Sequence, residues 1–178
     1  MTAKEQIQLI GIDKFNVLDR IHQLLKGKFL ITGSISLLAY GICKRTIGDI
    51  DILVDDLDAF KTLLEKQNFM TEEGGHYDKG NNFIPERVGF SIKGVKCCAF
   101  RRKPRQRFKS FSFLASRTFN VAHPKGAIEA KKGYVKVLYS EDRLTAAQIA
   151  RLNKHSADIE AYYQQFMITK QEELLPFL

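Results

Sequence analysis

The chain has 178 residues, of which 44% are hydrophobic and 27% are charged, with 4 prolines and 12 glycines. This composition argues against a disordered or low-complexity chain and favours one folded domain. The net charge of +8 favours a polyanionic partner, although such an excess also keeps many proteins soluble.

The cysteine content and the absence of long apolar runs predict a cytoplasmic protein. The three cysteines, Cys43, Cys97 and Cys98, are odd in number and two are neighbours, which argues against a disulfide framework. They form no C-x-x-C pair, which argues against a cysteine zinc site. The first residues lack the profile of a signal peptide. No apolar run approaches the ~20 residues that cross a bilayer, so we expect no membrane partner.

In the first half of the chain, apolar spacing alternates between helical and strand-like periods. Apolar residues at three- and four-residue steps predict helices, and short apolar runs next to glycine predict buried strands. The expected elements are a helix over 13–25, a strand over 29–32, a helix over 35–40, a strand over 49–54 and a helix that starts near 55–58.

The second half is expected to be richer in strands and to end in a helix. The expected elements are a loop over 70–82, a hairpin of strands over 83–92 and 95–100, weaker strands over 111–121 and 134–139, and a helix over about 145–168. Thr145 and Gln148 have the spacing of a capping box at the start of that helix.

This order of elements predicts an α/β (α+β) fold. We expect one domain over 1–178, in which a small mixed sheet is flanked by helices. Its core would span about 12–140, and the C-terminal helix would pack against that core.

Two acidic residues on one strand are the main indication of chemistry. Asp49 and Asp51 are two residues apart, so on a strand both side chains point to the same face. Paired carboxylates repel each other unless they are solvated or hold a cation, and Mg²⁺ prefers such oxygens together with substrate phosphates. Gly33 and Ser34 follow the preceding strand, where a glycine turn lets backbone approach a phosphate closely.

The segment 30–54 resembles the signature of the nucleotidyltransferase superfamily. That signature is a hydrophobic strand, Gly-Ser or Gly-Gly, a helix, and Asp-x-Asp on the next strand; here Gly33-Ser34 and Asp49-x-Asp51 are the matching residues. Members are similar to the catalytic core of polymerase β. They include aminoglycoside, minimal bacterial and toxin-type enzymes, the last of which imply a toxin–antitoxin-like setting.

The resemblance implies transfer of a nucleoside monophosphate from an NTP to an acceptor hydroxyl. Asp49 and Asp51 would bind one or two Mg²⁺ ions, and Gly33 and Ser34 would hold the β- and γ-phosphates. The acceptor is open: a small molecule such as an antibiotic, a tRNA or a protein. The residues expected to offset phosphate charge are Arg45, Arg151 and Lys154.

The final helix carries a polar side beside its apolar stripe. Arg151, Lys154, His155 and Asp158 lie on this side, and bacterial antibiotic- and toxin-type members often end with a similar pattern. The helix would either close over the nucleotide site or present these charges to solvent, as helical charge runs usually do.

The family usually has a third carboxylate on a later strand, and it is absent from the expected position. That position falls near Cys98, on the strand over 95–100. Three explanations remain open: the expected strand register is wrong, Glu86 on the partner strand substitutes, or the chain binds a nucleotide or RNA without turnover. Loss of a general base typically costs ~10² to 10⁴ in rate.

A basic segment over 101–109 is the second candidate site. Its six cations either form a solvated loop or grip a triphosphate, an RNA backbone or another anionic substrate. They are Arg101, Arg102, Lys103, Arg105, Arg107 and Lys109.

Overall fold

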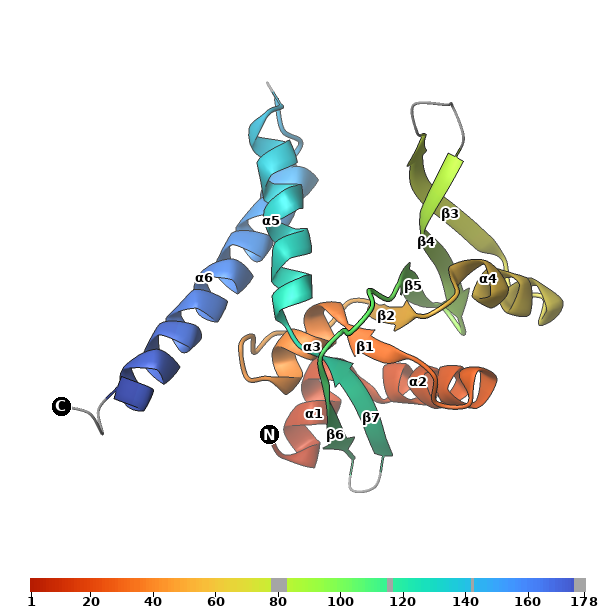
Figure 1. Cartoon of the computed structure of the whole chain (residues 1–178), viewed down its shortest axis with the longest axis horizontal. Helices are drawn as coiled ribbons and strands as arrows, with labels where there is room; N and C mark the ends of the chain where they lie inside the picture. Colours follow the sequence, from red (N-terminus) through yellow and green to blue (C-terminus); the bar gives the residue numbers. More distant parts are fainter. Residues whose placement is uncertain (78–82, 115–116, 142, 175–178) are drawn as a thin grey trace.

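The computed structural model describes residues 1–77, 83–114, 117–141 and 143–174 (Figure 1). Its helices are α1 (Ala3–Ile10), α2 (Ile12–Leu25), α3 (Gly33–Ala39), α4 (Leu57–Lys66), α5 (Lys125–Tyr139) and α6 (Ala146–Leu174). Its strands are β1 (Leu30–Thr32), β2 (Ile50–Val54), β3 (Thr71–Tyr77), β4 (Phe83–Ile92), β5 (Val95–Arg101), β6 (Phe108–Phe113) and β7 (Arg117–Ala122).

The strands form one mixed sheet in the order β3-β4-β5-β2-β1-β7-β6. β2 is antiparallel to β1 and parallel to β5, while β7 is parallel to β1. This arrangement confirms the α/β fold expected from the sequence. No helix in the described ranges is long and apolar enough to cross a lipid bilayer.

Burial along β2 separates the two faces of the sheet. Ile50, Ile52 and Val54 are buried, whereas Asp51 and Leu53 between them are only half-buried. The buried face packs with apolar residues of α2 and α4 in one core cluster. The other face of β2 therefore carries the acidic side chain, as the alternation of a strand requires.

Helix ends are fixed by local hydrogen bonds. The predicted capping box of α6 is confirmed: Gln148 N donates to Thr145 Oγ1 at 3.3 Å, and Thr145 N donates to Gln148 Oε1 at 2.8 Å. Thr2 and Glu5 make a second capping box, on α1. Asp56 caps α4 by accepting from Ala59 N at 2.9 Å.

The structure corrects several expected elements in the second half of the chain. Residues 134–139 were expected as a strand and instead end α5, because their β-branched alternation is part of a longer helical stripe that includes buried Ile128 and Leu138. Residues 71–77 form β3 rather than a loop, while 78–82 lie outside the described residues. The run over 111–121 is a hairpin of β6 and β7. α1 was not expected.

Figure 1 shows α5 and α6 standing beside each other as a helical hairpin next to the sheet. β3 and β4 lie at the opposite end of the sheet order from β6. The site described below lies where the α5–α6 hairpin faces β2.

Candidate active site

Asp51 lies at the centre of the sheet, directly beside Gly33. It pairs with Thr32 of β1 on one side and with Cys98 of β5 on the other. Gly33 has φ +63°, and a Cβ added there would overlap the Asp51 carboxylate. The glycine turn and the acidic side chain are therefore in contact, and only glycine leaves room for both.

The two carboxylates of the Asp-x-Asp motif affect each other. Burial, and then the charge of Asp49, raise the pKa of Asp51 to about 6. Asp49 itself is exposed and immediately precedes β2. The pair therefore forms a negatively charged spot in which one carboxylate is poorly solvated, an arrangement that attracts a cation.

Two lysines from the helical hairpin face this acidic pair. The charges of Lys131 on α5 and Lys154 on α6 both act to lower the pKa of Asp51. Burial and the neighbouring charge of Arg45 lower the pKa of Lys154, while Asp49 opposes that change. The hairpin thus places positive charge opposite the β2 carboxylates.

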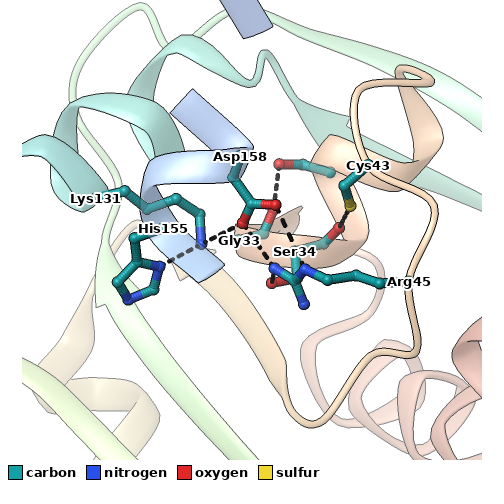
Figure 2. A network of polar contacts seen from close by, with 8 residues as sticks. Gly33, Ser34, Cys43, Arg45, Lys131, His155 and Asp158 are labelled. Carbon is teal, nitrogen blue, oxygen red and sulfur yellow. Dashed lines mark hydrogen bonds and ion pairs between the residues drawn. The ribbon is translucent and has the colours of Figure 1, made fainter. Parts of the chain in front are cut away.

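A polar network connects α6 to the glycine turn (Figure 2). Arg45 Nη2 donates to Asp158 Oδ2 at 2.7 Å and to Ser34 Oγ at 3.0 Å. Lys131 Nζ lies 3.1 Å from Asp158 Oδ2. Burial alone would raise the pKa of Asp158, but the hydrogen bond from Arg45 and the charge of Lys131 hold it below its ordinary value. Asp158 is 3% exposed, so the network is an internal one.

His155 extends the network along α6. Its Nδ1 lies 3.2 Å from Lys131 Nζ, and its ring meets Tyr134 edge-on at 5.2 Å. Burial and the charge of Lys131 lower the pKa of His155 to about 4. The imidazole is therefore neutral at pH 7, and Nδ1 accepts from the ammonium group, which has only donors.

Arg151 lies further along α6 than this network. Its guanidinium is 5.8 Å from the centre of the Tyr134 ring, and Nη1 donates to the Tyr134 hydroxyl at 3.4 Å. Seven residues separate it from Asp158, which is roughly 10 Å along a helix. Arg151 therefore contacts the hairpin interface instead of the carboxylates.

The position expected for a third acid is Cys98. The parallel register places Cys98 opposite Asp51, as the sequence analysis expected. Burial, and then the charge of Asp51, raise the pKa of the Cys98 thiol to about 11, while Arg87 opposes that shift. Glu86 lies at the bulge of β4, three residues from Gly89, which pairs with Cys98. Three strand residues span roughly 10 Å, so Glu86 is distant from Asp51.

An open groove of about 790 Å³ lies on the same side of the sheet. Its walls include Arg87 of β4, Phe100 of β5 and Ala130 of α5. Phe100 is two residues from Cys98 and so lies on the same strand face. One wall of the groove therefore lies on the sheet face that carries Asp51, because Phe100 pairs with Leu53, two residues along β2 from Asp51.

The structure thus brings most of the predicted site residues together and adds Lys131, which sequence reasoning missed. The residues brought together are Gly33, Ser34, Arg45, Asp49, Asp51 and Lys154. Lys131 was missed because α5 was not recognised. The helical spacing of Ile128, Lys131, Val135 and Leu138 was the available signal.

Comparisons with known proteins support the fold. No family model and no curated protein matches the chain. Among solved structures, the chain is similar to a proposed nucleotidyltransferase from Thermotoga maritima, with a TM-score of 0.52 and 18% identity. The match covers 74% of this chain and 91% of that chain. The fold is nucleotidyltransferase-like. At this identity the nucleotidyltransferase likeness concerns the fold alone.

Proposed function

We propose that the chain is a Mg²⁺-dependent nucleotidyltransferase, which transfers a nucleoside monophosphate from an NTP to an acceptor hydroxyl. The observation that carries this proposal is the contact of Asp51 with Gly33, with Asp49 beside it and Lys131 and Lys154 opposite. A polyphosphate needs such an arrangement: backbone that permits close approach, carboxylates for a divalent cation, and cations for the remaining charge.

The donor set fits Mg²⁺. Asp49 and Asp51 supply oxygen ligands. Burial, and then the charge of Asp49, raise the pKa of Asp51, and a divalent ion would favour its charged form. Among the described residues, no group of three His, Cys, Asp or Glu side chains forms a metal cluster. The remaining ligands would come from substrate phosphates and water, which is usual for this ion. When bound, Mg²⁺ would neutralise charge on the phosphate oxygens during transfer.

The side chains around the carboxylates would bind and orient the triphosphate. Gly33 would let the backbone approach a phosphate closely. Ser34 Oγ accepts a hydrogen bond from Arg45, and the hydroxyl proton stays available for a hydrogen bond to a phosphate oxygen. Arg45, Lys131 and Lys154 would offset phosphate charge. Because Asp158 already pairs with Arg45 and Lys131, it would keep these cations in position before the nucleotide arrives.

The reaction replaces one phosphorus–oxygen bond by another and releases the proton of the acceptor hydroxyl. The acceptor oxygen bonds to the α-phosphorus, and the bond from that phosphorus to the bridging oxygen breaks, which releases pyrophosphate and the hydroxyl proton. The Cys98 thiol would not take this proton at neutral pH, because a thiol with a pKa of about 11 stays protonated. The proton would therefore leave to solvent, and we expect slow turnover.

A second candidate function is favoured by the cysteine that stands at position 98, where a third acid is expected. A domain that lacks a third carboxylate next to Asp51 can bind a nucleotide or RNA without turnover. Both candidates require the pocket at Asp49 and Asp51, and they differ only in whether product forms.

A thermal-shift titration with each of the four NTPs, with and without Mg²⁺, tests the pocket. Saturation at 100 times Kd adds about 2.7 kcal/mol, which raises the Tm of a chain of this size by roughly 5–11 °C. Asp51→Asn should remove the Mg²⁺-dependent part. Asp13→Asn, which changes an exposed acid on α2, is the matched control and should behave like the wild type. If no NTP raises Tm in the presence of Mg²⁺, the enzyme and nucleotide binding without turnover are both wrong, and only RNA binding without turnover is left.

Turnover separates the two candidates. An NTP labelled at the α-phosphate is incubated with candidate acceptors, and transfer of the label is followed by chromatography. Label on an acceptor, lost in Asp51→Asn, supports the enzyme. Mg²⁺-dependent binding without transfer to any acceptor class supports the binding domain.

A further inference from the structure

The segment over 101–109, here called the basic strap, crosses the sheet beside the candidate active site. It joins β5 to β6, which are separated in the sheet by β2, β1 and β7. The crossing spans four strand spacings, or roughly 19 Å. Figure 1 shows this connection as the green trace that runs from β5 to β6.

Contacts at both ends fix the course of the basic strap. Arg102 N donates to Val54 O at 2.7 Å, at the end of β2. At the other end, His123 N donates to Arg107 O at 2.8 Å, next to the start of α5. Between them, Lys103 lines the groove together with Ala130 of α5. The strap therefore borders this groove through Lys103.

The cations of the strap divide into two groups. Arg101 lies 3.4 Å from Asp58, and Arg102 lies 3.6 Å from Asp55, so the first two are paired with exposed acids. In the part of the chain that the structure describes, the other four have no ion pair with an acidic side chain. These four are Lys103, Arg105, Arg107 and Lys109.

Further positive charge collects where the strap meets α5. The charges of Arg107, Lys109 and Lys125 all reach His123, whose pKa is lowered by burial and then by these three neighbours. Three cations around one neutral imidazole form a strongly positive surface, which suits a partner that carries many phosphates. A single triphosphate would be served by Arg45, Lys131 and Lys154 alone.

An exposed aromatic residue lies at the end of the strap, in register with the carboxylates. Phe108 pairs with Ala122, and the same row continues through Thr32 to Asp51. Three strand spacings, or roughly 14 Å, separate Phe108 from Asp51 on one face of the sheet. Phe108 is 46% exposed, and the guanidinium of Arg102 lies 5.6 Å from its ring centre. Exposed aromatics beside cations are the stacking platforms of single-strand binding proteins.

We propose that the basic strap binds the sugar-phosphate backbone of a single-stranded nucleic acid, with Phe108 as a stacking position for a base. A strand held there leads along the sheet towards Asp51, which makes nucleic acid the acceptor class. That role as acceptor rests on the proposed function, whereas binding to the strap does not. RNA and DNA share this backbone chemistry.

Fluorescence anisotropy with labelled 20-residue oligo(U) and oligo(dT) tests the proposal. Four phosphate contacts imply a slope near −2.8 in a plot of log K against log salt, or roughly 50-fold weaker binding between 50 and 200 mM salt. Replacement of Lys103, Arg105, Arg107 and Lys109 by Gln should weaken binding at least 50-fold at low salt and flatten that slope. Preference for oligo(U) over oligo(dT) identifies RNA, and the reverse identifies DNA.

A matched variant controls for net charge. Lys4, Lys26, Lys28 and Lys66 are exposed on α1, after α2 and on α4, and their replacement by Gln removes the same total charge. This control should keep binding within threefold of the wild type. Phe108→Ala should weaken binding fivefold or more, whereas Val137→Ala, at another exposed apolar residue, should not.

Other outcomes would overturn the proposal. If the strap variant and the charge control lose the same amount of oligonucleotide binding, the loss is an effect of net charge alone. Binding to polyglutamate or to phosphatidylserine vesicles as strong as to either oligonucleotide would also overturn it. The thermal shift with NTP and Mg²⁺ is measured on the same variants. Oligonucleotide binding that persists in Asp51→Asn supports the strap even if nucleotide binding fails.

Discussion

Arg45 and Asp158 form a two-point contact between residues 113 apart in the sequence. Nη2 and Nε of Arg45 lie 2.7 and 3.4 Å from the two carboxylate oxygens of Asp158. One residue lies in the loop after α3, and the other on α6. The contact joins the last helix to the turn that contains Gly33, so it connects the stability of α6 with the geometry of the candidate site.

Asp158→Ala should destabilise the fold by about 3 kcal/mol, because loss of one partner leaves the Arg45 and Lys131 charges partly buried and unpaired. Urea unfolding measures the change. Glu160→Ala, at an exposed acid on the same helix, should change stability by no more than about 0.5 kcal/mol. Equal effects of the two substitutions would contradict a structural role for the network.

Gly33→Ala should destabilise the protein by about 2 kcal/mol or more, since a side chain there has strained φ and meets the Asp51 carboxylate. Gly48→Ala is the matched control, because an added Cβ at Gly48 has no atom within 4 Å. Thermal unfolding of both variants gives the comparison. A Gly33→Ala protein as stable as Gly48→Ala would argue against the packing of Asp51 on the turn.

The pKa of His155, lowered to about 4, predicts how stability changes with pH. In the unfolded chain the histidine titrates near 6.5, so between pH 6.5 and 4 the unfolded state binds more protons. Stability should therefore fall as the pH is lowered through this range. We expect the free energy of unfolding to fall by about 2 kcal/mol over this range. This is less than the full pKa shift implies, because the ring is partly solvated.

His155→Asn should remove this pH dependence while it keeps an acceptor near Lys131 Nζ. Urea midpoints of the two proteins, compared between pH 4.5 and 7.5, isolate the contribution of the imidazole from that of the carboxylates. Parallel curves for the two proteins would show that His155 titrates in the fold as it does in the unfolded chain.

Cys98→Asp should create the carboxylate that the site lacks. The register with Asp51 would bring three acids together, so stability without metal should fall, while Mn²⁺ binding, followed by electron paramagnetic resonance, should tighten tenfold or more. If the chain is an enzyme, turnover should rise. Ser91→Asp, which adds one acid at an exposed position on β4, should leave Mn²⁺ binding unchanged.

Much of the site could be predicted from sequence because its residues are close together in the chain. Gly33 directly follows β1, and Asp51 lies on the neighbouring strand β2, which the short helix α3 connects to β1. The strand period places the two carboxylates on one face. The resemblance to the nucleotidyltransferase signature placed the missing acid near Cys98, and the register of β2 with β5 pairs Cys98 with Asp51.

The remainder depends on tertiary contacts that no local pattern specifies. The run over 134–139 has strand-like alternation, and its helical state is decided by packing of α5 against α6 and α3. Residues 71–77, rich in acids and glycines, form an edge strand only because β4 offers hydrogen bonds. Lys131 could not be placed at the site without the hairpin.

The order in which residues leave the ribosome gives the Arg45–Asp158 contact a temporal consequence. At 5–20 residues per second, roughly 6 to 23 s pass between synthesis of the arginine and of its carboxylate partner. For nearly all of that interval the growing polypeptide already contains the glycine turn and both Asp49 and Asp51, but not the anchor that orders the arginine. The arrangement of Arg45 at the candidate site would thus be completed late during translation, when α6 is made.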